Sequence, residues 1–371
     1  MSDQRAVPYL YMRGGTSKGP VFLRDDLPED RDTLAELLLA VMGTGHPLNI
    51  DGIGAGNAVT MKIPILSRAE EEWADVDYFF VQLQVMDRSV DFTTTCGNML
   101  TTVGPAAVEL GLIEPKDGTT EVRIRAVNTG GRFVSTVQTP GGKVVYGGDA
   151  SIDGVPGTAA PVALRFMDIT GSKTGSILPT GRTIDVIDGV EVTCMDVTMP
   201  VAIMRASDLG LTGGETREEL DADAALFKRM EAIRLQAGEM MGLGDVSRSV
   251  APKLALLSRA AEGGTIRARY FMPWQTHPTL AATSSQCLAA CALTPGTIAD
   301  GLLERPERTV DAAGDRAPIT VRIEHPLGAM DVTVDIEGEG TDTVVHSAEI
   351  LRTARKLASG SLHVPAGIWE G

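Results

Sequence analysis

The sequence predicts an α+β protein built from two lobes of similar structure. Its 371 residues exceed the usual size of one hydrophobic core, so two domains of nearly equal size are expected. Short stretches rich in β-branched and aromatic residues recur between Gly, Pro, Asn and Asp, whereas few stretches have helical periodicity. A segment of the first half also recurs in the second half, which indicates that both lobes follow one topology.

Strands and helices are predicted from the type and spacing of apolar residues. Strand composition marks the ranges 78–85, 122–127, 133–138, 143–146, 184–199 and 319–336. Helical spacing marks the ranges 32–42 and 221–241. A third helix is expected directly after Cys96. It should be buried along nearly its whole length, because no charged residue occurs before Glu109.

The repeated segment places two lysines in equivalent positions. VTMKIPILSRA at 59–69 matches VAPKLALLSRA at 250–260, so that Lys62 corresponds to Lys253. In each half, a strand that begins Pro-Val and a helix that ends Met-Gly come before this segment, and an apolar helix entered through small residues follows it. We expect two copies of one unit that face each other about a pseudo-twofold axis, with a cleft between them.

The boundary between the lobes is expected in SILPTGRTID, residues 176–185, where Pro and Gly cluster between two strand-rich blocks. The first lobe would then comprise residues 1–182 and the second lobe residues 183–359. A final strand of about residues 360–371 would be free to return to the first lobe.

Charge and composition exclude several classes of function. The formal net charge of −16 opposes binding to nucleic acid or to an anionic membrane. The N-terminal residues lack the apolar region of a secretory signal, and no run of apolar residues is long enough for a membrane span, so a cytoplasmic location is expected. The four cysteines are too few and too scattered for a disulfide framework, and reduced thiols are expected.

Several familiar site motifs are absent or have the wrong spacing. RGGTSKGP at 13–20 lacks the P-loop spacing and runs into a strand-like segment. DGIGAGNAV at 51–59 contains GxGxG and not GxGxxG, which argues against a dinucleotide site. The five histidines show no spacing typical of a metal site, and there is no GxSxG elbow. Neither a metal nor a cofactor is therefore expected.

Cys96 and Lys62 remain as candidates for chemistry. Cys96 stands where DFTTT leads into the uncharged helix, whose first N–H groups would bind a carboxylate and favour a thiolate, and Gly97 permits close approach. Lys62 lies in the apolar strand NAVTMKIPIL, and burial between the lobes would disfavour its charged form, so that the amine can act as a base. On these residues alone, Cys96 is equally readable as a small core residue and Lys62 as a lysine whose stem lies along the sheet edge.

Longer motifs give the sequence a resemblance to one known family. RGGTSKG, DGIG followed by Lys62, CGN at Cys96, VEVTCMD at 190–196 and MGLGDVS at 241–247 are together similar to the PrpF-like family, which shares the diaminopimelate epimerase fold. The similarity extends over nearly the whole chain. Within the family the sequence looks most like the 4-oxalomesaconate tautomerases (isomerases) of gallate and protocatechuate degradation, through LPTG at Leu178, EAIRLQ at Glu231, GDVS and RTARKL at Arg352.

The resemblance implies a fold of two lobes, each a barrel-like mixed sheet around a central helix, with both helix N-termini directed at one cavity. It also implies that Lys62 and Cys96 form an acid/base pair. Diaminopimelate epimerases carry one cysteine in each half, but the matching turn of the second half is Thr-Ser-Ser at 283–285, so symmetric two-thiol epimerisation is not expected. Simple spacing between the repeats would instead place Cys287 opposite Cys96.

The implied activity is a 1,3-proton shift in an unsaturated oxo-polycarboxylate such as 4-oxalomesaconate, without a cofactor. Lys62 would remove a proton next to an oxo or carboxylate group, backbone N–H groups would stabilise the dienolate, and Lys62 or Cys96 would return the proton. The expected substrate-binding residues are Thr16, Ser17, Lys18, Gly97, Asn98, Arg269, His277, Thr283, Ser284 and Ser285, with Lys253 as a further candidate. Arg269 shares one strand face with Arg267, and both are equally readable as solvated side chains.

Two other functions stay open. The same Lys62 chemistry would isomerise 2-methylaconitate, aconitate or methylitaconate. A protein of another class, a non-catalytic accessory protein, would bind such ligands in support of a partner enzyme. The expected partner is a small tricarboxylate substrate, with neither nucleic acid nor membrane, and a homodimer is one expected assembly.

Overall fold

The chain forms two compact units in the computed structural model, which describes residues 3–306, 309 and 316–369. Unit 1 consists of Met1–Arg165 and Leu351–Gly371, and unit 2 consists of Phe166–Ile350. The chain thus passes between the units at 165–166 and at 350–351. The boundaries expected from the sequence are at 182–183 and at about residue 360. Each unit is described below by itself.

The loop that leads into unit 2 is attached there by a buried carboxylate. Asp196 is fully buried and accepts hydrogen bonds from the Ser172 hydroxyl and from the backbone N–H groups of Lys173 and Thr174, at 2.8 to 2.9 Å. A carboxylate buried in this way is stable only with such partners. The loop therefore folds with unit 2, although its Pro- and Gly-rich composition resembles a linker.

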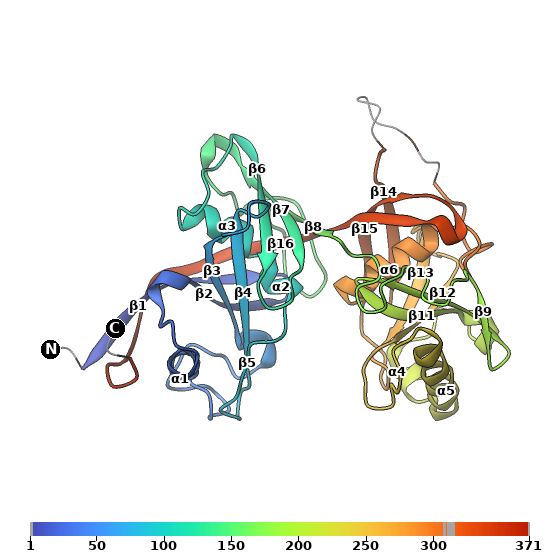
Figure 1. The fold of residues 1–371 in the computed structure, drawn as a ribbon, viewed down its shortest axis with the longest axis horizontal. Coiled ribbons are helices and arrows are strands. Elements are labelled where there is room, and N and C mark those ends of the chain that lie inside the picture. The colour runs from blue at the N-terminus through green and yellow to red at the C-terminus, as the bar shows by residue number, and fades with distance from the viewer. Residues whose placement is uncertain (1–2, 307–308, 310–315, 370–371) are drawn as a thin grey trace. The chain divides into compact units, whose positions relative to one another are not determined.

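Unit 1 contains a closed barrel of eight strands within its described residues. These strands are β1 Gln4–Gly14, β2 Ser17–Leu23, β3 Lys62–Arg68, β4 Val76–Leu83, β6 Gly118–Ala126, β7 Arg132–Thr139, β8 Pro161–Met167 and β16 Val344–Pro365, and the short β5 Val90–Asp91 pairs with β4. They are neighbours in this order, and pairing of β1 with β16 closes the ring (Figure 1). The sheet is mixed, as predicted, because β2–β3 and β4–β6 are parallel whereas β1–β2 and β3–β4 are antiparallel.

A helical segment lies inside this barrel, and another helix covers its outer face. Inside, α2 Gly97–Leu100 packs on β1, β2 and β3, and α3 Val103–Glu109 packs on β3, β6 and β7. Outside, α1 Arg31–Met42 buries Leu37 and Leu38 against β2, β3 and β4. Because side chains alternate along a strand, each residue of β3 and β4 points either to the inner helices or to α1.

Unit 2 repeats this topology. Its elements are β9 Asp185–Ile187, β10 Val190–Val197, β11 Met199–Arg205, α4 Arg217–Asp221, α5 Ala224–Met240, β12 Lys253–Ser258, β13 Ile266–Phe271, α6 Ala282–Leu293, β14 Ile319–His325 and β15 Gly328–Glu337, together with the start of β16 (Figure 1). The parallel pairs β11–β12 and β13–β14 correspond to β2–β3 and β4–β6. The α6 helix packs on β10, β11, β14 and β15, and α5 packs on the opposite face through Met230 and Ile233. The predicted repeat is confirmed, and Lys62 and Lys253 open the corresponding strands β3 and β12.

The helix expected after Cys96 is buried as predicted, but the expectation of one continuous helix is wrong. It is divided into α2 and α3. Pro105 has no N–H group to donate to the carbonyl of Thr101. The hydroxyls of Thr101 and Thr102 also bond to the carbonyls of Gly97 and Met99, at 3.1 and 2.6 Å. Such side-chain bonds compete with the regular helical ladder, and the first turn after Cys96 is therefore short.

One further sequence prediction needs correction, and another is confirmed. No strand forms at 143–146, because the preceding turn Pro140–Gly142 places Gly141 and Gly142 at positive φ and only Val145 bonds back to β7. The helix predicted at 221–241 is confirmed as α5, which Asp223 caps, and the short helix α4 that precedes it was not predicted. Among the described residues, every helix is too short or too polar to traverse a lipid bilayer.

Candidate functional site

Lys62 is the first residue of β3, and its side chain lies on the inner face of the barrel. Ile63 and Ile65 pack against α1, so alternation directs Lys62 to the other face. Gln82 of β4 stands directly opposite Lys62, and the Lys62 Nζ donates a hydrogen bond of 2.6 Å to the Gln82 Oε1. The Lys62 Nζ also lies 5.4 Å from the centre of the Phe80 ring, which is two residues along the same face of β4. Two side chains of the neighbouring strand β4 thus hold the amine at the start of β3.

Cys96 occupies the N-cap position of α2 and is partly exposed. Its side chain makes no capping bond, and the first N–H groups of a helix have no acceptor within the helix. A methyl group placed on Gly97 would meet no atom within 4 Å, so the space above this turn is open. The Tyr78 hydroxyl donates to the carbonyl of Cys96 at 3.3 Å, and burial raises the pKa of Tyr78 well above its ordinary value.

Tyr78 and Phe80 connect the two candidate residues within unit 1. Both rings lie on the inner face of β4, with centroids 6.1 Å apart. Tyr78 contacts the Cys96 backbone, and Phe80 contacts the Lys62 amine. Lys62 and Cys96, the predicted acid/base residues, therefore both contact side chains of β4. Their catalytic roles stay a prediction.

The glycines of RGGTSKG explain how the N-terminal loop reaches this region. A Cβ at Gly14 would lie 2.2 Å from the carbonyl oxygen of Asn98, and one at Gly19 would lie 1.8 Å from that of Lys62. Only glycine allows backbones to approach so closely. The Asn98 amide donates to the Thr16 hydroxyl at 2.9 Å and approaches the Ser17 hydroxyl at 3.5 Å. Four predicted site residues, Thr16, Ser17, Gly97 and Asn98, are thus brought together beside Cys96.

Lys18 is not part of this cluster. It follows Ser17 in β2, so its side chain points to the opposite face of the strand. There its Nζ lies 6.0 Å from the centre of the Tyr11 ring, and the Tyr11 hydroxyl bonds to the carbonyl of Ile53. Its predicted contact with substrate carboxylates stays a prediction, without support from this placement.

In unit 2, His277 and Ser284 meet at Tyr270 near the start of α6. The Ser284 hydroxyl donates to the Tyr270 hydroxyl at 2.7 Å, and the Tyr270 and His277 ring centroids are 5.6 Å apart. Burial raises the pKa of Tyr270 to about 12. Burial lowers the pKa of His277, as do the charges of Arg217 and Lys253, against the opposing hydrogen bond from Thr279. The lowered pKa favours the uncharged imidazole of His277.

The remaining predicted residues of α6 lie in its first turn. The N-cap is Ala281, and Thr283 is partly buried while Ser284 and Ser285 are fully buried. The Ser285 hydroxyl donates to the carbonyl of Ala282, and the carbonyl of Thr283 accepts from Thr198. The hydroxyls of both serines thus already have protein partners.

Arg269 lies apart from the α6 cluster. It pairs with Leu256, which packs against α5, whereas the adjacent Tyr270 points toward α6. Arg269 is only 5% exposed, its Nε donates to the carbonyl of Glu215 at 2.7 Å, and burial lowers its pKa. It is therefore not a freely solvated side chain. Lys253 is half-buried, and burial, together with the charge of Arg234, lowers its pKa.

The four thiols differ in environment. Cys194, Cys287 and Cys291 are buried, whereas Cys96 is partly exposed. Burial raises the pKa of Cys194 and of Cys291 to about 12, and it raises that of Cys287 well above its ordinary value. Cys287, which simple spacing would place opposite Cys96, lies in the middle of α6 and donates to the carbonyl of Met195. It is thus a core residue in this structure.

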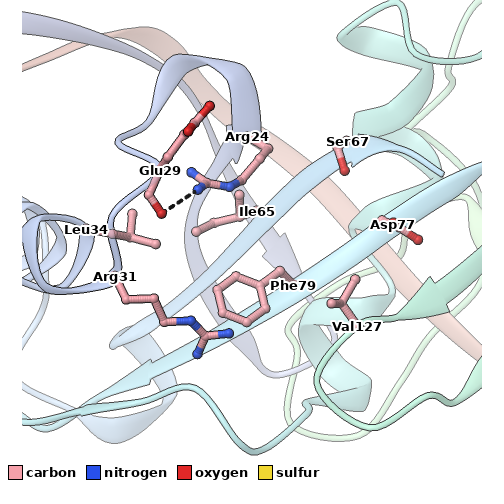
Figure 2. Close-up of a pocket in the computed structure, with 9 residues that line it drawn as sticks. All are labelled: Arg24, Glu29, Arg31, Leu34, Ile65, Ser67, Asp77, Phe79 and Val127. Carbon is pink, nitrogen blue, oxygen red and sulfur yellow. Dashed lines mark hydrogen bonds between the residues drawn. The ribbon is translucent and has the colours of Figure 1, made fainter. Parts of the chain in front are cut away.

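A pocket of about 240 Å³ opens on the other face of β3 and β4. Figure 2 shows Ile65 and Phe79 along its floor, with Arg24, Glu29 and Arg31 beside the start of α1. The Arg24 guanidinium is occupied by the backbone carbonyls of Pro28 and Glu29. Because Ile65 and Phe79 point away from the barrel interior, this pocket is separate from Lys62 and Cys96.

Comparison with known proteins identifies the family of this chain. A family model described as "PrpF protein" matches residues 4–365. The chain belongs to the PrpF family. The resemblance deduced from the motifs is therefore confirmed over nearly the entire sequence.

Several proteins with similar sequences are named as isomerases. The chain is 48% identical over 361 residues to "Putative isomerase YbhH" of Escherichia coli (strain K12), covering 97% of this chain and all of that protein. It is 43% identical over 359 residues to "(4E)-oxalomesaconate Delta-isomerase" of Novosphingobium sp. (strain KA1), covering 97% and 98%. The crystal structure of a methylitaconate-delta-isomerase matches with a TM-score of 0.90 at 30% identity, covering 99% of this chain and 97% of that one. The predicted two-lobed α+β fold is confirmed.

Some motifs that carry the PrpF resemblance have structural roles. Arg234 of EAIRLQ is fully buried, pairs with Glu231 at 2.6 Å, and donates to the carbonyls of Val246 and Ser249. It thereby fixes the GDVS loop that leads to Lys253. No group of three or more His, Cys, Asp and Glu side chains in the described ranges is arranged to hold a metal ion.

Sequence reasoning missed Gln82, Tyr78 and Phe80 as parts of the site. The signal was present in the strand YFFVQL, because residues at alternate positions share one face. Gln82 shares one face of the strand with Tyr78 and Phe80, and a polar side chain on such a face needs a partner. Its pairing with Lys62 depends on the register of β3 against β4, which the sequence alone does not provide.

Proposed function

We propose that this protein is a cofactor-independent isomerase that shifts a proton in an unsaturated oxo-polycarboxylate, with 4-oxalomesaconate as substrate in the degradation of aromatic compounds. The relative at 43% identity, named for oxalomesaconate isomerisation, supports the substrate class. The observation that carries the chemistry is the Lys62 amine, which Gln82 and Phe80 hold on the face of the barrel that also carries Cys96.

The reaction begins with Lys62 as a neutral amine. Its lone pair removes a proton from the carbon next to the oxo or carboxylate group, and the electron pair of the broken C–H bond spreads over the conjugated oxygens as a dienolate. The N–H groups of Gly97 and Asn98 donate hydrogen bonds to the charge that develops there. Proton return at the distant carbon, by Lys62 or by Cys96, completes the shift, and no atoms are gained or lost.

Other groups would hold the carboxylates. In unit 1 these are the hydroxyls of Thr16 and Ser17, while His277 and the first turn of α6 stay candidates through the family resemblance. Lys18, Arg269 and Lys253 remain weaker candidates, because Lys18 faces Tyr11 and Arg269 is bonded to Glu215. A tricarboxylate bound by hydroxyls and helix N–H groups is compatible with the strongly acidic chain, since the attraction is local. The cytoplasmic location, and assembly as a homodimer, are part of the proposal.

A second candidate is isomerisation of 2-methylaconitate or methylitaconate. The similarity to a methylitaconate-delta-isomerase structure, at a TM-score of 0.90, favours it. The same proton shift would serve either substrate. The difference would lie in the groups that receive the extra oxo-carboxylate or the methyl group.

Purified protein assayed side by side against 4-oxalomesaconate, 2-methylaconitate and methylitaconate would separate these functions. The reaction is monitored by the absorbance of the enol or diene. The highest kcat/KM is expected with 4-oxalomesaconate. Replacement of Lys62 by Met should lower turnover by a factor of roughly 10²–10⁴ while leaving the fold intact. Each assay should also be run in D₂O, because a non-catalytic binding protein would cause no exchange of substrate protons with solvent. Full activity of the Lys62→Met variant would refute the base assignment.

A further inference from the structure

We propose that Gln82 is a positioning residue for Lys62, which directs the amine lone pair to the substrate without placing a negative charge beside it. The inference rests on the proposed function and deepens it. It starts from the contact already described, in which the Lys62 Nζ donates to the Gln82 Oε1 at 2.6 Å across paired positions of β3 and β4.

The orientation of the Gln82 amide is fixed by its other end. Its Nε2 lies 2.9 Å from the carbonyl oxygens of Met61 and of Leu83, and 3.3 Å from that of Ala58. Carbonyl oxygens only accept hydrogen bonds, so the amide nitrogen must face them. The oxygen must consequently face Lys62. This network settles the assignment of oxygen and nitrogen, which electron density or packing alone often leaves ambiguous.

The amide oxygen determines where the lysine lone pair can point. A neutral amine has two N–H bonds and one lone pair, and a protonated amine has three N–H bonds. Since Gln82 presents only an acceptor, one N–H bond is directed at it in both states and the lone pair is directed elsewhere. Within the described residues, no other side chain or backbone group hydrogen-bonds to the Lys62 amine. The directions that neither Gln82 nor the Phe80 ring occupies are thus left for substrate.

Gln82 also differs from a carboxylate in a way that matters for a base. A glutamate of the same shape would stabilise the ammonium and keep the lysine protonated. No carboxylate of the described chain forms an ion pair with Lys62. The titratable groups that neighbouring elements bring to this face are Tyr78 of β4, Asp91 of β5 and Cys96 before α2. The Asp91 carboxylate bonds to the backbone and hydroxyl of Thr93, and these bonds lower its pKa.

The internal repeat provides a comparison within the same chain. Lys253 begins β12 as Lys62 begins β3, but the register of β12 with β13 pairs Leu254 with Phe271. One step further, Met272 stands where unit 1 has Gln82. A thioether is a poor acceptor and cannot replace the amide oxygen. The repeat has therefore kept the lysine in both units but the orienting amide only beside Lys62.

Two substitutions separate positioning from a merely structural role. Gln82→Glu retains size and acceptor but adds a charge, and Gln82→Met retains size but removes the acceptor. In Gln82→Glu, the acid limb of the kcat/KM profile should move to higher pH by about one to three units, with activity recovering at high pH. In Gln82→Met, kcat should fall roughly 10- to 100-fold at every pH, because a hydrogen bond to a group that becomes charged is lost.

An independent readout avoids reliance on activity. NMR of ¹³Cε-labelled lysine, with the Lys62 signal assigned from the Lys62→Met spectrum, should show the Lys62 titration midpoint moving up in Gln82→Glu. Gln138→Glu, the same charge change on β7 of the same barrel, should leave both the midpoint and the profile in place.

An unmoved midpoint in Gln82→Glu, or wild-type kcat in Gln82→Met, would overturn the role of Gln82. An inactive Lys62→Met variant in either case would leave the proposed function intact. Full activity of Lys62→Met would instead overturn the proposed function, whatever the Gln82 variants show.

Discussion

Replacing Glu324 by Gln should destabilise unit 2 by roughly 3 kcal/mol at neutral pH. Glu324 is 4% exposed, and its carboxylate accepts from the N–H groups of Ala261, Glu262 and Gly264 at 2.6 to 2.9 Å and from the Arg267 Nε at 3.1 Å. Burial by itself would raise the pKa of Glu324, but these hydrogen bonds outweigh it and lower the pKa from 4.5 to about 2. At 1.36 kcal/mol per pH unit, this difference corresponds to roughly 3 kcal/mol.

The effect should depend on pH in a defined direction. Because the folded pKa is depressed, the stabilisation is fully present above about pH 4.5 and is lost as the pH falls toward about 2. The difference between wild type and Glu324→Gln should therefore shrink to about 2 kcal/mol at pH 3.5. Hydrogen exchange of the amides of residues 261–264 and of β14, measured from pH 3.5 to 7, reports the opening free energy of this region.

The matched control is Glu262→Gln, in the same loop. The Glu262 side chain is 79% exposed and lies 3.8 Å from Arg267, so its loss should change stability by less than about 1 kcal/mol. A Glu324→Gln variant that lost less than about 1 kcal/mol at pH 7, or whose deficit stayed constant on acidification, would refute the reasoning. In that event the buried hydrogen bonds would not favour the charged carboxylate.

Three further predictions concern the first unit and the thiols. If the Cys96 thiol returns the proton, the Cys96→Ala variant should still exchange substrate protons with D₂O but should form no product. Product formation at the wild-type rate would show that Cys96 only lines the site. Gly19→Ala should reduce stability and activity together, because the new Cβ would lie 1.8 Å from the carbonyl oxygen of Lys62. Gly97→Ala should keep the melting temperature and raise KM, because its Cβ enters open space. Iodoacetamide at pH 7.5 should label Cys96 in the native protein, and mass spectrometry should find Cys194, Cys287 and Cys291 modified only after denaturation, because burial keeps those thiols protonated.

The repeat was the most informative feature of the sequence. It predicted two units of one topology and placed Lys62 and Lys253 in equivalent strands, both of which the structure confirms. The position of Cys96 at the start of a helix was also readable, because a strand-like segment changes there into an uncharged one. These features depend on local composition and on comparison of the chain with itself.

Other features depend on register and could not be predicted. Whether Arg269 faces α5 or α6 is decided by its pairing with Leu256, and the partner of Lys62 is decided by pairing with Gln82. The 22-residue β16 was largely missed because its polar residues lack strand composition, and its hydrogen bonds come from β1, β8 and β15. The division of the inner helix required attention to Pro105, whose effect was hidden by an uninterrupted apolar composition.

The placement of Lys62 and Cys96 has a consequence for the mechanism. Both belong to unit 1, where Tyr78 and Phe80 of β4 connect them. Gly19 of β2 lies against the backbone of Lys62, and Gly14 of β1 lies against the backbone of Asn98. The separation of Lys62 and Cys96 is therefore set within one closed barrel, whose strands have no free edge to shift along.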